Sequence, residues 1–184
     1  MSGLKIRKYG DTILRAKCEE VKEINDEVKD LARKMLRTMH RDDGIGLAAP
    51  QVGDKRRIIV VDIGHSPLIL INPKIIKKSD KMAKEFEGCL SLPGINLRIK
   101  RPQNVEVEGY LLEREQNVHP VKSRETGISP RAKLFNRVKI KAEDLLARDL
   151  QHEIDHLDGV LIIDKVPFFK KLKAIKKLKK KLRE

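Results

Sequence analysis

We predict an α+β fold in which sheets cover both sides of one helix in the C-terminal third of the chain. Two stretches, one near residues 25–40 and one from residue 143, repeat apolar residues at helical spacing. Between them, short apolar runs and alternating patterns indicate strands. The second helix carries apolar residues on one face and ionisable residues on the other, so we expect covering layers on both faces.

The first helix is expected to begin at Asn25, because Asn25 can cap a helix and the acids Asp26 and Glu27 would lie in its first turn. It should end near His40, whose side chain suits the negative end of the helix dipole. Its apolar face repeats at three- and four-residue spacing and consists of Val28, Leu31, Ala32, Met35, Leu36 and Met39.

Four strands are expected between the helices. Arg57–Ile63 and Leu68–Asn72 are apolar runs, which indicate buried strands. Two later stretches alternate apolar with polar residues and indicate half-buried strands; their apolar residues are Val105, Val107 and Leu111, then Val138 and Ile140. The segment Arg114–Arg137 between these two strands is polar and basic, and it is broken by proline and glycine, so we expect an inserted loop.

From Glu143 the chain is expected to be helical again. One face is apolar and consists of Leu146, Leu150, Ile154 and Leu157. The opposite face carries mostly groups that can bind ligands or protons: Leu145, Arg148, Asp149, His152 and His156. Arg148 and Asp149 lie one turn before His152, so we expect them to border the entrance of any pocket at this face.

The pentad from His152 to His156 has the form H-E-x-x-H. Helical residues four apart lie on one side, so the two histidines can bind one metal ion while Glu153 reaches a water molecule as a general base. A solvated helix can carry two histidines by chance. However, the chain has five histidines, and two of them flank this glutamate.

A third metal ligand is needed, and it must lie upstream of the pentad. A metzincin would place a third histidine where this chain has Ile162, and few carboxylates follow His156. Cys89 is the strongest candidate, because its thiolate suits a borderline-soft ion and Gly88 would let the backbone approach closely. The remaining candidates have simpler interpretations, as a partly buried thiol, a helix-end residue and loop residues: Cys18, His40, His65 and His119.

A third segment, Gly44–Gly53, is small and apolar and contains one amide side chain, that of Gln51. A tight turn between a helix and a strand would explain its glycines. A preorganised amide donor beside a metal ion would also stabilise an oxyanion, and Gln51 is a candidate for that role.

The segments Gly44–Gln51, Glu87–Ser91 and Gln151–Gly159 together resemble the GIGLAAPQ-like, EGCLS-like and HExDH-like segments of the peptide deformylases, in that order. The resemblance covers most of residues 1–165. It implies antiparallel sheets wrapped around the helix that bears the pentad. It also implies a shorter turn where this chain has the expected insertion, and apolar residues in some members where this chain has Arg148 and Asp149.

The same resemblance implies roles for individual residues. The metal ligands would be Cys89, His152 and His156, and Glu153 would transfer protons. The Gln51 side chain and the Leu90 backbone N–H would form the oxyanion site. The backbone around Ile45 and Gly46, together with Gly88, would hold the substrate. The implied reaction is hydrolysis of the formyl group from N-terminal formyl-methionine of nascent polypeptides, with Fe²⁺ as the natural ion and zinc, nickel or cobalt possible in a purified sample.

Composition indicates where such a protein would act. Two cysteines give no disulfide framework, the N-terminus has no apolar leader, and no run is long enough to cross a membrane, so we expect a cytoplasmic protein. Residues 165–184 contain ten Lys or Arg residues and one acid, which accounts for most of the net charge of +14.

This basic tail repeats apolar residues at helical spacing, from Phe168 to Leu182. We therefore divide the chain into a catalytic domain, 1–165, and a basic amphipathic tail, 166–184. Ribosomal RNA is the expected partner of the tail, and an anionic membrane surface is the alternative. Two other functions remain open from the residues alone: a general H-E-x-x-H metallopeptidase and a nucleic-acid-binding module.

Overall fold

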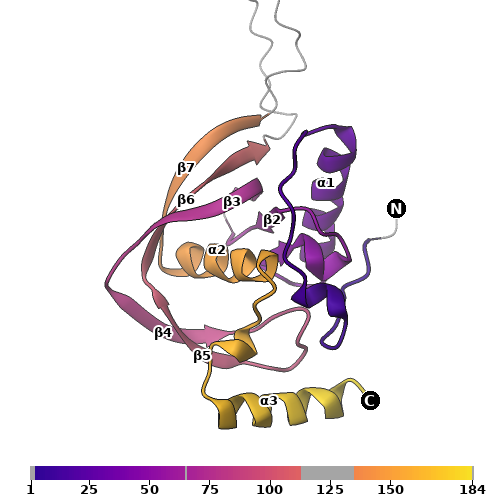
Figure 1. Ribbon diagram of the computed structural model, residues 1–184, viewed down its shortest axis with the longest axis vertical. Helices are drawn as coiled ribbons and strands as arrows, with labels where there is room; N and C mark the ends of the chain where they lie inside the picture. Colours follow the sequence, from indigo (N-terminus) through magenta and orange to yellow (C-terminus); the bar gives the residue numbers. More distant parts are fainter. Residues whose placement is uncertain (1–2, 65, 113–134, 184) are drawn as a thin grey trace, which may run out of the picture.

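The computed structural model describes residues 3–64, 66–112 and 135–183, which form an α+β fold with antiparallel sheets (Figure 1). Its three α-helices are α1 (Asp26–Arg41), α2 (Asp144–Leu157) and α3 (Phe168–Lys181). Short 3-10 helices lie at Thr12–Arg15 (η1), Ala49–Val52 (η2) and Ile162–Asp164 (η5). The strands are β1 (Gly46–Ala48), β2 (Ile58–Val61), β3 (Leu68–Lys78), β4 (Met82–Glu87), β5 (Leu97–Pro102), β6 (Asn104–Leu112) and β7 (Phe135–Glu143).

The larger sheet has five strands in the order β1-β2-β3-β6-β7, and all its neighbouring strands are antiparallel. Alternate residues of β2 face opposite layers. Ile58 and Val60 pack with α1, whereas Ile59 and Val61 pack with α2. The sheet is therefore buried on both faces, which explains why β2 is apolar throughout.

Helix α2 lies between this sheet and the second sheet, a hairpin of β4 and β5 (Figure 1). Ala147, Leu150 and Leu157 pack against the five-stranded sheet. The opposite face of α2 holds buried polar groups, and one of them, Gln151, donates to the Pro102 carbonyl at the end of β5. The expected enclosed helix is thus confirmed, with apolar packing on one side and polar chemistry on the other.

The first helix also agrees with the prediction. The Asn25 side chain caps α1 by accepting a hydrogen bond from the Val28 N–H, and Asp26 and Glu27 lie in the first turn. His40 lies in the last turn, where its Nε2 atom is 2.9 Å from Asp62 Oδ2. His40 therefore pairs with a carboxylate at the end of the helix and does not belong to the group of candidate metal ligands.

Three predictions for the strands need correction. The strand predicted to end at Asn72 is β3, which continues to Lys78. Asn72 has a left-handed φ of 53°, and its side chain forms hydrogen bonds with the Val21 backbone. These features explain why the apolar pattern breaks at Asn72. The last strand begins at Phe135, inside the expected insertion. The remainder of that insertion, from Arg114 to residue 134, and both His65 and His119 lie outside the described residues. Strands β1, β4 and β5 were not predicted from the sequence.

Helix α3 packs beneath the β4–β5 hairpin (Figure 1). Its Ala174 and Leu178 are buried with Leu92, Ile95 and other residues of a third apolar cluster. The expected stripe is only partly buried, since Phe168, Leu172 and Leu182 are exposed. Among the described residues, no helix combines the length and apolar character required to span a membrane.

Candidate active site

A cavity of about 560 Å³ opens between β1, the loop after β4, and the polar face of α2. Cys89, His152 and Glu153 line its inner wall. Exposed apolar side chains stand at its rim: Ile45, Phe86 and Leu145. The chain therefore combines a polar floor with an apolar entrance, as expected for a site that binds a peptide and reacts with one of its polar groups.

The three predicted metal ligands lie together, and two of them, Cys89 and His152, line the cavity. One ligand atom each from Cys89, His152 and His156 lies within 4.8 Å of the other two. Cys89 Sγ is 3.2 Å from His156 Nε2, and both histidines project from α2 at the spacing that the sequence predicts. One thiolate and two imidazoles suit a borderline-soft divalent ion, whose bonds to such ligands are roughly 2.0–2.3 Å long. The donor set therefore fits a single metal ion and leaves room for a further ligand.

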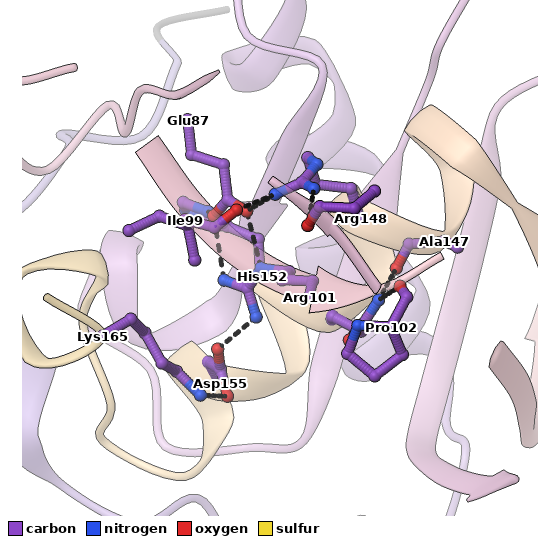
Figure 2. A network of polar contacts seen from close by, with 11 residues as sticks. Glu87, Ile99, Arg101, Pro102, Ala147, Arg148, His152, Asp155 and Lys165 are labelled. Atoms are coloured by element: carbon purple, nitrogen blue, oxygen red, sulfur yellow. Dashed lines mark hydrogen bonds and ion pairs between the residues drawn. The ribbon is translucent and has the colours of Figure 1, made fainter. Parts of the chain in front are cut away.

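Glu87 orients one of these histidines (Figure 2). Its Oε2 atom is 3.0 Å from His152 Nδ1, which leaves the other ring nitrogen of His152 for a metal. Its Oε1 atom accepts hydrogen bonds from Arg101 Nε and Arg148 Nη1, both at 2.6 Å. Arg101 also donates to Asp155 on α2, which in turn accepts from Lys165. This network joins β4, β5 and α2 behind the site.

The network also fixes charge states. Burial alone would raise the pKa of Glu87, but hydrogen bonds from His152 and Arg101 lower it to about 2, so this carboxylate stays ionised. Burial likewise opposes ionisation of Cys89. The nearby His156 and His152 outweigh it and hold the pKa of the thiol well below its ordinary value. Cys89 is therefore prepared to act as a thiolate ligand.

Glu153 is buried beside β1. A Cβ atom at Gly46 would lie only 2.5 Å from Glu153 Oε1 and 2.7 Å from the carboxylate oxygens of Asp149. Only glycine fits at position 46, because any side chain would displace one of these carboxylates. Burial raises the pKa of Glu153 well above its ordinary value, partly offset by His152 and reinforced by Asp149. A carboxyl group whose pKa is raised in this way is suited to accept a proton and return it during a reaction.

Gln51 is held with its amide N–H₂ toward the cavity. Its Oε1 atom accepts a 2.7 Å hydrogen bond from the Ala48 N–H, which fixes the orientation of the side chain. Its Nε2 atom is 3.6 Å from Cys89 Sγ and 3.3 Å from Ser91 Oγ. Leu90 lines the same cavity, and its carbonyl accepts from Lys8 Nζ at 2.8 Å. The amide of Gln51 is thus preorganised to donate beside the metal ligands.

The candidate substrate-binding residues lie at the cavity, whereas Cys18 lies away from it. Ile45, Gly46 and Gly88 line the cavity, as expected for substrate-binding residues. The reason given for Gly88 is wrong, because a Cβ there would meet only the Ile95 carbonyl oxygen at an ordinary 3.9 Å. Cys18 is buried in the apolar core, which raises the pKa of its thiol to about 11.

Sequence reasoning missed the roles of Arg101, Ser91 and the Glu87 carboxylate. Glu87 carried a usable signal, since a metal-binding histidine needs a second partner and Glu87 is close to Cys89 in the sequence. Arg101 carried none, because a lone arginine in a basic stretch has the pattern of a surface residue. Its burial depends on the pairing of β4 with β5, which places Ala83 opposite Arg101.

Comparison with known proteins agrees with this geometry. A family model described as polypeptide deformylase matches residues 3–172. A peptide deformylase of Endomicrobium trichonymphae is 44% identical over 184 residues, covering 98% of this chain and 96% of that protein. One of Dictyoglomus thermophilum is 44% identical over 160 residues, covering 87% of this chain and 90% of that protein. A crystal structure of the Ehrlichia chaffeensis peptide deformylase in complex with actinonin superposes with a TM-score of 0.83 at 37% identity, with full coverage of both chains.

Proposed function

The chain belongs to the polypeptide deformylase family and is a hydrolase of N-formyl-methionyl peptides, and from this premise we propose how its own residues carry out the reaction. Cys89, His152 and His156 hold one divalent ion, and Glu153 transfers protons. The observation that carries this proposal is the close group of one thiol and two imidazoles. Next to it, one buried oxygen of Glu153 has no hydrogen-bond partner among the described residues.

The bound ion would act as a Lewis acid that lowers the pKa of water at the site and polarises the formyl group. Glu153 accepts a proton from the attacking water as its oxygen adds to the formyl carbon. The Gln51 amide and the Leu90 N–H donate to the formyl oxygen as it gains negative charge. Glu153 then gives the proton to the leaving nitrogen as the C–N bond breaks. The products are formate and a free N-terminal methionine.

Ile45, Gly46 and Gly88 hold the substrate backbone at the cavity wall. Support comes from β1, an edge strand of the five-stranded sheet, whose free edge can pair with an extended peptide. The space next to Gly46 is narrow, because the carboxylates of Asp149 and Glu153 already lie against it. A formyl group is small enough to react in such a space, whereas an internal peptide bond would bring a side chain on each side.

Fe²⁺ is the natural ion in this proposal, and zinc, nickel or cobalt would replace it in a purified sample. The family resemblance favours iron, while the ligand set accepts all four ions. Metal content and activity, measured together after anaerobic purification, would identify the ion. Highest activity per bound iron supports the assignment, and full activity with zinc alone would overturn it.

Formate release tests the reaction itself. Formyl-Met, acetyl-Met and unblocked peptides of otherwise identical sequence should be compared under the same conditions. We expect formate from the first peptide and no turnover of the other two. Cleavage of internal peptide bonds would instead support the alternative, a general H-E-x-x-H metallopeptidase.

We further propose that residues 1–165 carry catalysis and residues 166–184 bind the ribosome. Every proposed catalytic group lies between Ile45 and His156, whereas residues 166–184 carry a net charge of +8. Four basic residues in or just after α3 border one concave patch: Lys176, Lys179, Lys180 and Arg183. Ribosomal RNA would meet this patch where nascent chains emerge, and the protein would therefore act in the cytoplasm.

A further inference from the structure

Asp149 has a buried carboxylate without a function in the mechanism above. It lies on α2, one turn before His152 and Glu153, and lines the cavity with only 6% of its surface exposed. Its Oδ2 atom has no hydrogen-bond partner among the described residues. A buried acceptor left unpaired costs about 1–3 kcal/mol, so a group that donates to it would bind favourably.

The neighbouring arginine does not neutralise Asp149. Arg148 donates to Glu87 and to the Ile99 carbonyl (Figure 2), and also to the Ala83 carbonyl. Both oxygens of Asp149 instead lie against Gly46. Glu153 contributes a second carboxylate at the same point. Two carboxyl groups therefore lie together in this part of the cavity, where each can accept a hydrogen bond.

The position of Asp149 determines which part of a substrate it would meet. Residues one helical turn apart lie about 5–6 Å from each other on the same helix face. A formyl group that reacts beside Glu153 would therefore place the first side chain of its peptide near Asp149. On the other side, this space is bounded by the apolar side chains of the rim, including Leu145 and Phe86.

We infer that Asp149 is a specificity-determining residue, whose free carboxylate oxygen accepts a hydrogen bond from the end of the substrate's first side chain. This inference rests on the proposed function and extends its substrate class. Besides formyl-methionine, the enzyme would accept N-formyl peptides whose first residue is unbranched and ends in an ammonium or amide group. The apolar rim holds the stem of such a side chain, and Asp149 holds its tip.

A matched pair of substrates tests this inference. Formyl-norleucyl and formyl-ornithyl peptides of otherwise identical sequence have first side chains of equal length, one ending in a methyl group and the other in an ammonium group. The measured quantity is the ratio of their kcat/KM values in each protein, which cancels changes in folding or metal content. The proteins are the wild type, Asp149→Leu, Asp149→Asn and, as a control, Asp80→Asn in an exposed turn.

We expect Asp149→Leu to lower the ornithyl-to-norleucyl ratio at least about tenfold, as loss of a charge-assisted hydrogen bond would. Asp149→Asn should lower it less, and Asp80→Asn should leave it unchanged. A ratio that is the same in the wild type and both Asp149 variants would overturn the inference. If the wild type releases formate from formyl-Met peptides, that result refutes the inference alone; if it releases none, the proposed function itself fails.

Discussion

Three buried side-chain atoms lack a hydrogen-bond partner among the described residues, and all three are on α2 near the metal ligands: Asp149 Oδ2, Glu153 Oε2 and His156 Nδ1. Folded proteins normally pair such atoms, because an unpaired buried polar group lowers stability. Their concentration at one place indicates that this part of the helix is built to receive a ligand, water or ion. The unpaired atoms lower the stability of the fold but remain available to bind a ligand, water or ion.

Single substitutions in the site are expected to have different effects on metal content and turnover, according to the role of each residue. Glu153→Ala should keep the fold and the bound metal but lose about 10²–10⁴-fold in turnover, because it removes only the proton-transfer group. Cys89→Ala should lose metal first and activity with it. Metal content by mass spectrometry and formate release distinguish the two variants. An active Glu153→Ala enzyme, or a Cys89→Ala protein with one full equivalent of metal, would contradict the assignment.

Gln51 offers a sharper kinetic test. A donor that strengthens its hydrogen bond only as charge develops should affect kcat, so Gln51→Ala is expected to lower kcat about 10²–10³-fold with little change in KM. Steady-state kinetics on a formyl-Met peptide provide both constants. Ser91→Ala is a useful companion, since it removes one partner of the Gln51 amide and leaves the donor in place. An effect on KM alone would make Gln51 a simple binding residue.

Among the elements, the β4–β5 hairpin supports the site from behind. Glu87 at the end of β4 connects Arg101 of β5 with Arg148 and His152 of α2. Two buried cations therefore depend on one carboxylate. Such a network is weak evidence for net stability, but loss of its central acid leaves buried charges unpaired.

We predict that Glu87→Gln weakens metal binding about 10–100-fold, because His152 loses the carboxylate that orients its ring. The free energy of unfolding should also fall by about 3–5 kcal/mol, since Arg148 loses its charged partner and Arg101 keeps only Asp155. Metal titration and denaturant unfolding provide the two values. Glu85→Gln, exposed on the same strand, is the control. Equal metal affinity in both variants would rule out the orienting role.

The attachment of α3 is expected to depend on pH through Asp164. Burial alone would raise the pKa of this carboxyl, but hydrogen bonds from Arg15 and from Lys171 of α3 lower it to about 2. A folded-state pKa below the unfolded one stabilises the protein above the unfolded value, and this contribution disappears as pH falls through the folded value. Asp164 should therefore contribute stability at neutral pH and lose it between about pH 4 and 2.

Asp164→Asn should accordingly lower the free energy of unfolding at pH 7 by about 1 kcal/mol, allowing for screening of these partly exposed ion pairs. The difference from the wild type should vanish as the pH approaches 2. Denaturant unfolding across this range measures it, with Asp30→Asn on the exposed face of α1 as the control. A difference that is independent of pH would exclude the electrostatic explanation.

The elements also differ in how far the sequence predicts them. α1, α2, α3 and β6 follow from apolar periodicity, because their apolar residues recur regularly on one face. β4 and β5 were not predicted because they contain many charged residues. Two of these, Glu87 and Arg101, are buried only through strand pairing and contact with α2. His152 and His156 were predictable as candidate metal ligands because their helical spacing is typical of metal-binding pairs. The Glu87 network was not, since it depends on register and on tertiary contacts.

At the scale of the whole molecule, catalysis and charge are separated. Two of the three candidate metal ligands, His152 and His156, are on α2, whereas the basic patch lies along α3 and its C-terminal end. The inner side of α3 nevertheless contributes to the catalytic domain. Ala174 and Leu178 pack with Leu92 and Ile95, which line the cavity. Removing all of α3 would therefore expose part of the core and confuse partner binding with folding.

A substitution of the outer face alone is the better test of the tail. Changing Lys176, Lys179, Lys180 and Arg183 to Gln should leave formate release and stability nearly unchanged, because all four side chains are exposed. Ribosome binding should weaken most at low salt, and the slope of log affinity against log salt should decrease, since fewer counterions are released from RNA. Sedimentation with purified ribosomes over a range of salt concentrations measures both effects.

Two controls make this result decisive. Changing Lys74, Lys77, Lys78 and Lys139 to Gln removes the same charge from exposed positions on the five-stranded sheet and should preserve binding. Leu178→Ala, in contrast, should lower the free energy of unfolding by about 2–5 kcal/mol and leave the charge of the basic patch unchanged. If both quadruple variants lose binding equally, the tail acts only through net charge. If neither loses binding, the ribosome is not the partner of α3, and its lysines serve solubility.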